Sequence, residues 1–139
     1  MSVSLQGKEL HKLHSKVDLA WAEINSHFDL SDDAVAIRCV KANEIKKLNR
    51  KYRDKDSETN VLTFTYGDGQ HDIALCLKVA QSEAKERDVE IGEYIMLLIV
   101  HGLLHVAGLD HERSEEEVSK MRSLEQRLLH QVGVKGISL

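Results

Sequence analysis

The sequence predicts an α+β fold, with a mixed sheet of about four strands packed against helices. Three observations support this prediction. Segments with strand periodicity gather in the first half of the chain, helical periodicity dominates the second half, and one helical segment is apolar on every side. The chain has 139 residues without a repeat or a linker-like segment, so we expect residues 1–139 to form one domain.

The first forty residues alternate between strand and helix patterns. Ser2–Gln6 alternates polar and apolar residues, which predicts a strand. Leu10–Phe28 carries apolar residues at helical spacing, which predicts one helix with a stripe that faces the core. A polar turn then leads to Ala34–Val40, where alternate apolar residues predict a second strand.

A basic helix and a hairpin are expected next. Lys41–Arg53 returns to helical spacing. Val61–Tyr66 is rich in β-branched and aromatic residues and is expected to form a strand. Gly67–Gln70 has the composition of a turn, so that Asp72–Leu77 would pair with the preceding strand as a hairpin.

The rest of the chain is expected to be helical. A short helix is predicted from Lys78 to about Arg87. Ile91–Ala107 has almost no polar face, which predicts a buried helix. Ser114 and Glu117 have the spacing of a capping box that starts a last helix, and Gly133 would stop it.

The composition indicates the compartment and the class of partner. No segment has the flanks of a signal peptide, and charged and histidine residues interrupt the longest apolar run, so we expect a cytoplasmic protein without a membrane span. Cys39 and Cys76 are expected to be unpaired core residues. The net charge of −4 disfavours nucleic acid, but Lys41–Lys55 contains seven basic and two acidic residues. This segment would either attract phosphates or form an ordinary solvated helix face.

The most informative segment lies between His101 and His111. His101 and His105 are four residues apart, which places both imidazoles on one face of a helix. Gly108 can adopt the left-handed conformation that ends a helix, so the chain would turn there and bring His111 back toward the pair. Three imidazoles that leave one position open are typical of a catalytic zinc site, and we expect one zinc ion per chain.

The alternative for each histidine alone is an ordinary surface or core residue. Imidazoles within an apolar helix need partners, however, and a metal ion suits all three. The pattern differs from the H-E-x-x-H motif of metalloproteases, because Gly102 stands where those enzymes carry the glutamate that acts as general base. Any chemistry would therefore depend on water activated by the metal and on side chains from elsewhere in the chain.

Four motifs, in the same order along the chain, resemble those of the YbeY family, the bacterial metal-dependent endoribonucleases of ribosomal RNA maturation. Leu48–Asp56 resembles the family's L-N-x-x-Y-R-x-K-D, Thr59–Phe64 its T-[DN]-V-L-S-F, His71–Leu75 its G-D-I-x-I, and His101–His111 its H-G-x-L-H-x-x-G-x-D-H. Met121 and Glu125 match the usual M-x-x-x-E. The resemblance extends from about Val35 to Leu129.

The resemblance implies a zincin-like domain and a zinc-dependent endoribonuclease that acts on single-stranded RNA. The implied process is ribosome maturation, including processing of the 3′ end of 16S rRNA, with precursor rRNA and a ribosomal subunit or ribosome-associated proteins as partners. His101, His105 and His111 would bind zinc, and Arg53 would be the functional arginine beside the cleft. This chain departs from the family motifs at four positions outside the metal set, which are Glu58, Thr63, Thr65 and His71.

Further polar residues are candidates for supporting roles. Lys46 and Arg50 share a helix face with Arg53 and would help it to hold phosphoryl oxygens. Asp110 would either orient an imidazole or cap the turn, and Asp72 would either contribute to the site or only end a strand. Two other functions remain open, a metalloprotease-like hydrolase and a non-catalytic ribosome-assembly factor that docks through the basic helix.

Overall fold

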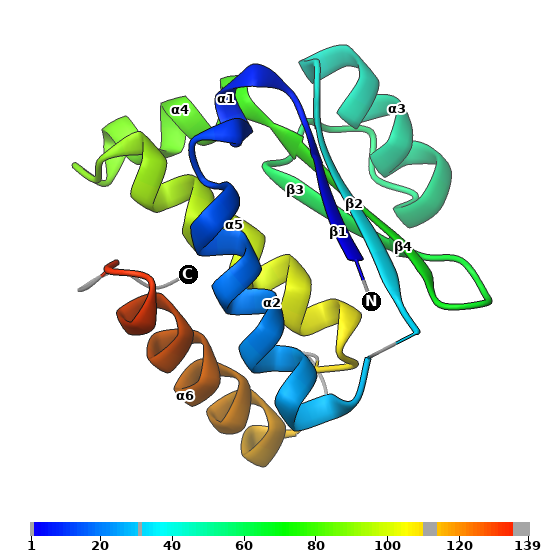
Figure 1. The fold of residues 1–139 in the computed structure, drawn as a ribbon. Coiled ribbons are helices and arrows are strands. Elements are labelled where there is room, and N and C mark those ends of the chain that lie inside the picture. Colours follow the sequence, from blue (N-terminus) through cyan, green and yellow to red (C-terminus); the bar gives the residue numbers. More distant parts are fainter. Residues whose placement is uncertain (1, 31, 110–113, 135–139) are drawn as a thin grey trace.

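The computed structural model describes residues 2–30, 32–109 and 114–134 (Figure 1). Within these ranges the chain forms four strands and six helices. In chain order they are β1 (Ser2–Gln6), α1 (Lys8–His11), α2 (His14–Phe28), β2 (Ala34–Val40), α3 (Ala42–Arg53), β3 (Val61–Thr65), β4 (Gln70–Cys76), α4 (Leu77–Glu86), α5 (Ile91–Val106) and α6 (Glu115–Gln131).

The strands form one mixed sheet in the order β1-β2-β4-β3. β2 pairs in parallel with β1 and with β4, whereas β3 and β4 are antiparallel. The register aligns Ile37 of β2 with Ile73 of β4, and Ile73 with Thr63 of β3. β3 is therefore an edge strand, and its outer side is not paired with another strand of this sheet.

Helices cover both faces of the sheet (Figure 1). α2 and α5 lie on one face, and α3 lies on the opposite face. The larger core joins Ile37 and Ile73 of the sheet to α2, α5 and α6. The smaller core joins Ile45 of α3 to Leu62 and Ala74. Side chains of β3 thus point alternately to the α5 side and to the α3 side, as the period of a strand requires.

α5 is the centre of the larger core. Every residue from Tyr94 to Val100 is buried, and the helix contacts α2, α4, α6, β3 and β4. Contacts on all sides explain why α5 lacks a polar face. Within the described ranges no single helix is long and apolar enough to cross a membrane, and only α4 and α5 taken together, with a bend of 116° between them, meet that test of length and composition.

The α+β class, the four strands and the buried helix are confirmed, but the prediction of one helix over Leu10–Phe28 is wrong. α1 ends at His11, and α2 begins at His14. Between them the N–H of Leu13 donates to the carbonyl of Leu10 at 3.0 Å. This tighter turn keeps both leucines buried, because residues three apart lie on the same side of a 3₁₀ turn.

The two cysteines are free thiols, as expected. Cys76 is buried at the end of β4, and Cys39 is half-buried in β2. Burial, together with the nearby carboxylate of Glu9, raises the pKa of the Cys39 thiol to about 11. The thiol therefore stays protonated at neutral pH and behaves as a small apolar side chain.

Two of the four departures from the family motifs contact each other in the hairpin. Thr65 and His71 are paired in the register of β3 and β4, and Oγ1 of Thr65 lies 3.0 Å from Nδ1 of His71. Nε2 of His71 lies 2.6 Å from Oδ2 of Asp33, just before β2. A buried imidazole requires such partners, so Thr65 and His71 fit this position as a pair.

Candidate active site

Helix α5 ends in a turn that depends on glycine. Gly108 has a φ of +94°, in the left-handed region, as predicted for this residue. The N–H of Gly108 donates to the carbonyl of His105 at 2.9 Å, and the N–H of Leu109 donates to the carbonyl of Leu104 at 3.1 Å. These two bonds form a Schellman motif, which redirects the chain directly after the second histidine of the helix.

The two histidines of α5 face each other. Their Nε2 atoms lie 3.0 Å apart, and the rings are inclined at 81°. Two Zn–N bonds at a tetrahedral angle would place their nitrogen atoms about 3.3 Å apart, so His101 and His105 fit two positions of a zinc site. The third predicted ligand, His111, and its neighbour Asp110 lie outside the described residues, and the residues described contain no cluster of three or more such ligands.

A buried carboxylate supports the first histidine. Glu125 of α6 is 2% exposed, and its Oε2 lies 3.2 Å from Nδ1 of His101. A carboxylate that accepts from Nδ1–H keeps the proton there and leaves the lone pair on Nε2, which faces His105. Carboxylates in this position orient metal-binding imidazoles. Glu125 matches a family motif in the sequence, but nothing in the sequence links it to His101.

A cavity of about 130 Å³ lies against the histidine pair. It is lined by Arg53 from the end of α3, Asn60 from the loop before β3, Val61 and Thr63 from β3, and His101 and His105. The fold thus brings Arg53 together with the two histidines, although α3 and α5 lie on opposite faces of the sheet (Figure 1). A guanidinium beside two imidazoles can hold an oxyanion such as a phosphoryl group in the cavity.

The end of α3 sets the position of Arg53. Asp54 follows in the left-handed conformation with a φ of 56°, and its N–H donates to the carbonyl of Asn49. The Asn49 side chain is buried, and its Nδ2 donates to the carbonyl of Ser57 at 3.0 Å. This bond ties the loop back onto the helix, so Arg53 leaves α3 where the loop turns toward β3.

Asn60 is fixed in the cavity wall from the opposite side. Its Nδ2 donates to Oε1 of Glu83 at 2.8 Å, and the Tyr94 hydroxyl donates to the same oxygen at 2.9 Å. Burial raises the pKa of the Tyr94 hydroxyl, and the hydrogen bond to Glu83 raises it as well. Tyr94 therefore keeps its proton and remains a donor to Glu83.

Among the described residues, the other predicted site residues do not line the cavity. Lys46 and Arg50 are exposed and lie on α3, toward its N-terminus from Arg53. Asp72 lies within β4 and accepts a hydrogen bond from the Tyr66 hydroxyl at 3.0 Å. The structure therefore groups Arg53 with the histidine pair, whereas Lys46 and Arg50 lie outside the lining of the cavity.

Gly102 is at a close approach of α5 to the sheet. A Cβ atom there would lie 3.0 Å from Cδ1 of Ile73 and 3.2 Å from Oγ1 of Thr63. A glutamate side chain at this position would therefore begin in tight contact with Ile73 and Thr63 of the sheet. The absence of a protease-type base thus follows from how closely α5 packs against β3 and β4.

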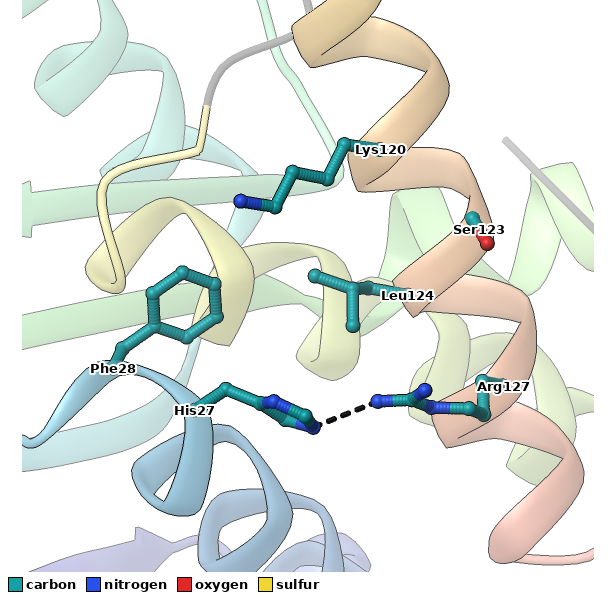
Figure 2. A pocket seen from close by; sticks show the side chains of 6 residues that line it. All are labelled: His27, Phe28, Lys120, Ser123, Leu124 and Arg127. Carbon is teal, nitrogen blue, oxygen red and sulfur yellow. Dashed lines mark hydrogen bonds between the residues drawn. The ribbon is translucent and has the colours of Figure 1, made fainter.

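The remaining histidines of α1 and α2 lie elsewhere. His11 and His14 are exposed, and Nδ1 of His14 contacts Asp18 at 3.1 Å. Figure 2 shows His27 in a separate hollow of about 360 Å³ between α2 and α6, where its Nε2 lies 2.7 Å from a guanidinium nitrogen of Arg127. This hollow shares no lining residue with the Arg53 cavity. His11, His14 and His27 are therefore exposed residues that lie apart from the cavity.

Together these features define the class: an α+β protein with a polar cavity at the C-terminal end of a buried helix, beside the edge strand of a mixed sheet. The solved structure of TM1509 from Thermotoga maritima is similar, with a TM-score of 0.68 and 26% sequence identity over 94% of this chain and 88% of that chain. A sequence model described as Endoribonuclease YbeY matches residues 3–133. The chain belongs to the YbeY family.

Curated relatives carry the same description. Endoribonuclease YbeY of Janthinobacterium sp. (strain Marseille) is 44% identical over 112 residues, which cover 76% of this chain and 73% of the relative. Endoribonuclease YbeY of Burkholderia pseudomallei (strain 1710b) is 42% identical over 108 residues, which cover 74% of this chain and 59% of that relative. Family membership supports an endoribonuclease role, and an endoribonuclease acts on RNA.

Proposed function

We propose that this chain is a zinc-dependent endoribonuclease that cleaves single-stranded RNA. The observation that carries the proposal is the cavity that Arg53 shares with His101 and His105, which provides a phosphate-binding cation next to two potential metal ligands. The family description supports the nuclease class. The donor set supports zinc, because imidazoles suit this borderline ion.

In this proposal His101, His105 and His111 hold one zinc ion. A bound zinc ion supplies Lewis acidity and lowers the pKa of water. The Arg53 guanidinium binds the scissile phosphate by two parallel hydrogen bonds and neutralises charge that develops on its oxygens. Glu125 orients His101 through Nδ1, and Asp110 acts on the third imidazole or only caps the turn.

The basic face of α3 would guide the RNA toward the cavity. Lys46 and Arg50 are exposed on the helix that Arg53 ends, so they contact phosphates next to the scissile one. We further propose that the substrate is precursor rRNA, including the 3′ end of 16S rRNA, that the protein associates with a ribosomal subunit or its proteins, and that it acts in the cytoplasm. Family membership supports these finer assignments.

Two other functions make different predictions. A metalloprotease requires a general base, and Gly102 provides none, so the cavity does not support this alternative. A non-catalytic assembly factor would use α3 for docking and the metal for stability. Such a factor would still bind RNA after the metal is removed. It would not cut the RNA in either state.

The test is a digest of single-stranded RNA, duplex RNA and casein by the zinc-loaded protein, with a chelator-treated sample as control. The proposal predicts cuts within the single-stranded RNA, loss of these cuts after chelation and their return when zinc is restored. Duplex RNA and casein should remain intact. Cleavage of casein would favour the protease, and RNA binding without cleavage in every sample would favour the assembly factor.

A further inference from the structure

Two exposed aromatic rings lie on the α3 side of the sheet. Among the described residues the exposed large hydrophobic side chains are Leu19, Tyr52 and Tyr66, with exposed fractions of 59%, 51% and 46%. Leu19 stands apart on α2. Tyr52 lies on α3, Tyr66 directly follows β3, and both belong to the α3 side of the sheet. Two of the three exposed hydrophobic side chains therefore lie in one region.

Phe64 lies beside Tyr52. The centroids of the Tyr52 and Phe64 rings are 5.0 Å apart, and the rings are inclined at 59°. Phe64 is half-buried against the smaller core, in the same strand direction as Tyr66 two residues later. Tyr66 is held by a hydrogen bond from its hydroxyl to Oδ2 of Asp72 at 3.0 Å. We call Tyr52, Phe64 and Tyr66 the aromatic strip.

Cations accompany the aromatic strip. Nζ of Lys51 lies 5.2 Å from the centroid of the Tyr52 ring. Arg53 directly follows Tyr52 on the same helix and is also exposed. Partial burial is the main cause that raises the pKa of the Tyr66 hydroxyl, and the hydrogen bond to Asp72 is the second. This ring therefore stays neutral. A polyanion with flat unpaired bases would meet both kinds of group here.

The aromatic strip and the cavity are joined across the edge strand. Val61 and Thr63 of β3 line the cavity, whereas Leu62 and Phe64 point to the α3 side. Arg53 lines the cavity, and its neighbour Tyr52 begins the aromatic strip. An RNA strand with its phosphate at Arg53 would therefore lie next to the Tyr52 end of the aromatic strip.

The far end of the aromatic strip opens into a hollow. It has a volume of about 340 Å³, and its lining includes Tyr66, Ala34, Ala36, Gln70 and Asp72. The two alanines leave room on the sheet, while Gln70 and Asp72 supply hydrogen-bonding side chains at its rim. A hollow of this size falls at the lower end of the range of small-ligand sites, which suits a single nucleobase.

We propose that the aromatic strip is a nucleobase-binding site, on which unpaired bases of the RNA next to the scissile phosphate stack. The proposal rests on the proposed function, because it takes the Arg53 cavity as the place where the phosphate binds. A nucleobase-binding site would explain why the protein prefers single-stranded RNA to duplex RNA. Bases within a duplex are stacked on each other and cannot lie on these rings.

The test measures binding of a short fluorescent single-stranded RNA, and of the same RNA with abasic riboses beside the cleavage site. Tyr52→Leu and Tyr66→Leu should each weaken binding of the intact RNA roughly tenfold, the scale of one lost stacking contact. Both variants should bind the abasic RNA as the unmodified protein does. Cleavage should show a raised KM with little change in kcat.

Three control variants separate stacking from folding. Leu19→Ala shortens an even more exposed apolar side chain on α2 and should leave binding unchanged. Tyr52→Phe and Tyr66→Phe keep the rings and should bind the intact RNA nearly as the unmodified protein does. The melting temperature of each variant reports folding.

The proposal is overturned if the leucine variants bind intact RNA normally, which would suit a strip that serves a protein partner. It is also overturned if they lose affinity equally for intact and abasic RNA. Normal cleavage by these variants would agree with the proposed endoribonuclease function but would contradict the role of the aromatic strip. Base-dependent binding without cleavage would support the aromatic strip and contradict the proposed function.

Discussion

Glu125 and His101 are 24 positions apart in the sequence, yet a carboxylate oxygen of one lies 3.2 Å from a ring nitrogen of the other. The carboxylate is 2% exposed, so its charge needs a partner inside the protein. His101 provides that partner and gains a fixed ring orientation in return. A buried carboxylate that contacts a candidate metal ligand is therefore stronger evidence for a metal site than either residue alone.

Glu125→Gln should weaken zinc binding by about 10- to 100-fold, the usual range for loss of a residue that orients a metal ligand. An amide keeps the size of the side chain but cannot favour Nδ1–H as a carboxylate does. The measurement is zinc affinity by competition with a chelating dye. Glu86→Gln, which changes an exposed glutamate of α4, is the control and should bind zinc normally. Equal zinc affinities of the two variants would show that Glu125 does not support zinc binding.

At the level of secondary-structure elements, the end of α5 depends on the conformation of Gly108. Gly108→Ala should destabilise the fold by about 1–2 kcal/mol, because an alanine at a φ of +94° is strained although no atom lies within 4 Å of its Cβ. Gly67→Ala is a matched control with equally open space and no positive φ. Chemical denaturation compares the two free energies of unfolding. Similar values for the two variants would mean that the turn does not depend on glycine.

The packing of α5 against the sheet gives a second prediction for an element. Gly102→Glu restores the glutamate of the H-E-x-x-H pattern, yet it should destabilise the fold by about 3 kcal/mol or more, because a carboxylate would be forced against Ile73 and Thr63. Ser82→Glu adds the same charge on the exposed side of α4 and serves as the control. Denaturation midpoints and a casein digest provide the readout. A stable Gly102→Glu variant that digests casein would contradict this account of the missing base.

At the scale of the whole molecule, sequence periodicity predicted the positions of the strands and of the buried helix, because these depend on local patterns. His101 and His105 were also predictable as a pair, since one helix carries both. The strand order and the meeting of Arg53 with the histidine pair were not, because they depend on packing between distant segments. The break before His14 was missed for a different reason: the apolar spacing continues across it.

The central claim is that Arg53 and the histidine pair form one site for RNA cleavage. The most direct measurement is the rate at which zinc-loaded Arg53→Lys cleaves single-stranded RNA, compared with the unmodified protein. Lysine keeps the charge but loses the fork of two parallel donors, so the rate should fall by about 10²-fold. Arg122→Lys, an exposed position on α6, is the control and should cleave normally.

Zinc content and melting temperature should be the same in all three proteins, because Arg53 is exposed and is not a proposed metal ligand. A hundredfold slower cleavage confined to Arg53→Lys is the predicted result. Cleavage by Arg53→Lys at the unmodified rate would show that Arg53 does not bind the scissile phosphate, and would contradict the proposed site.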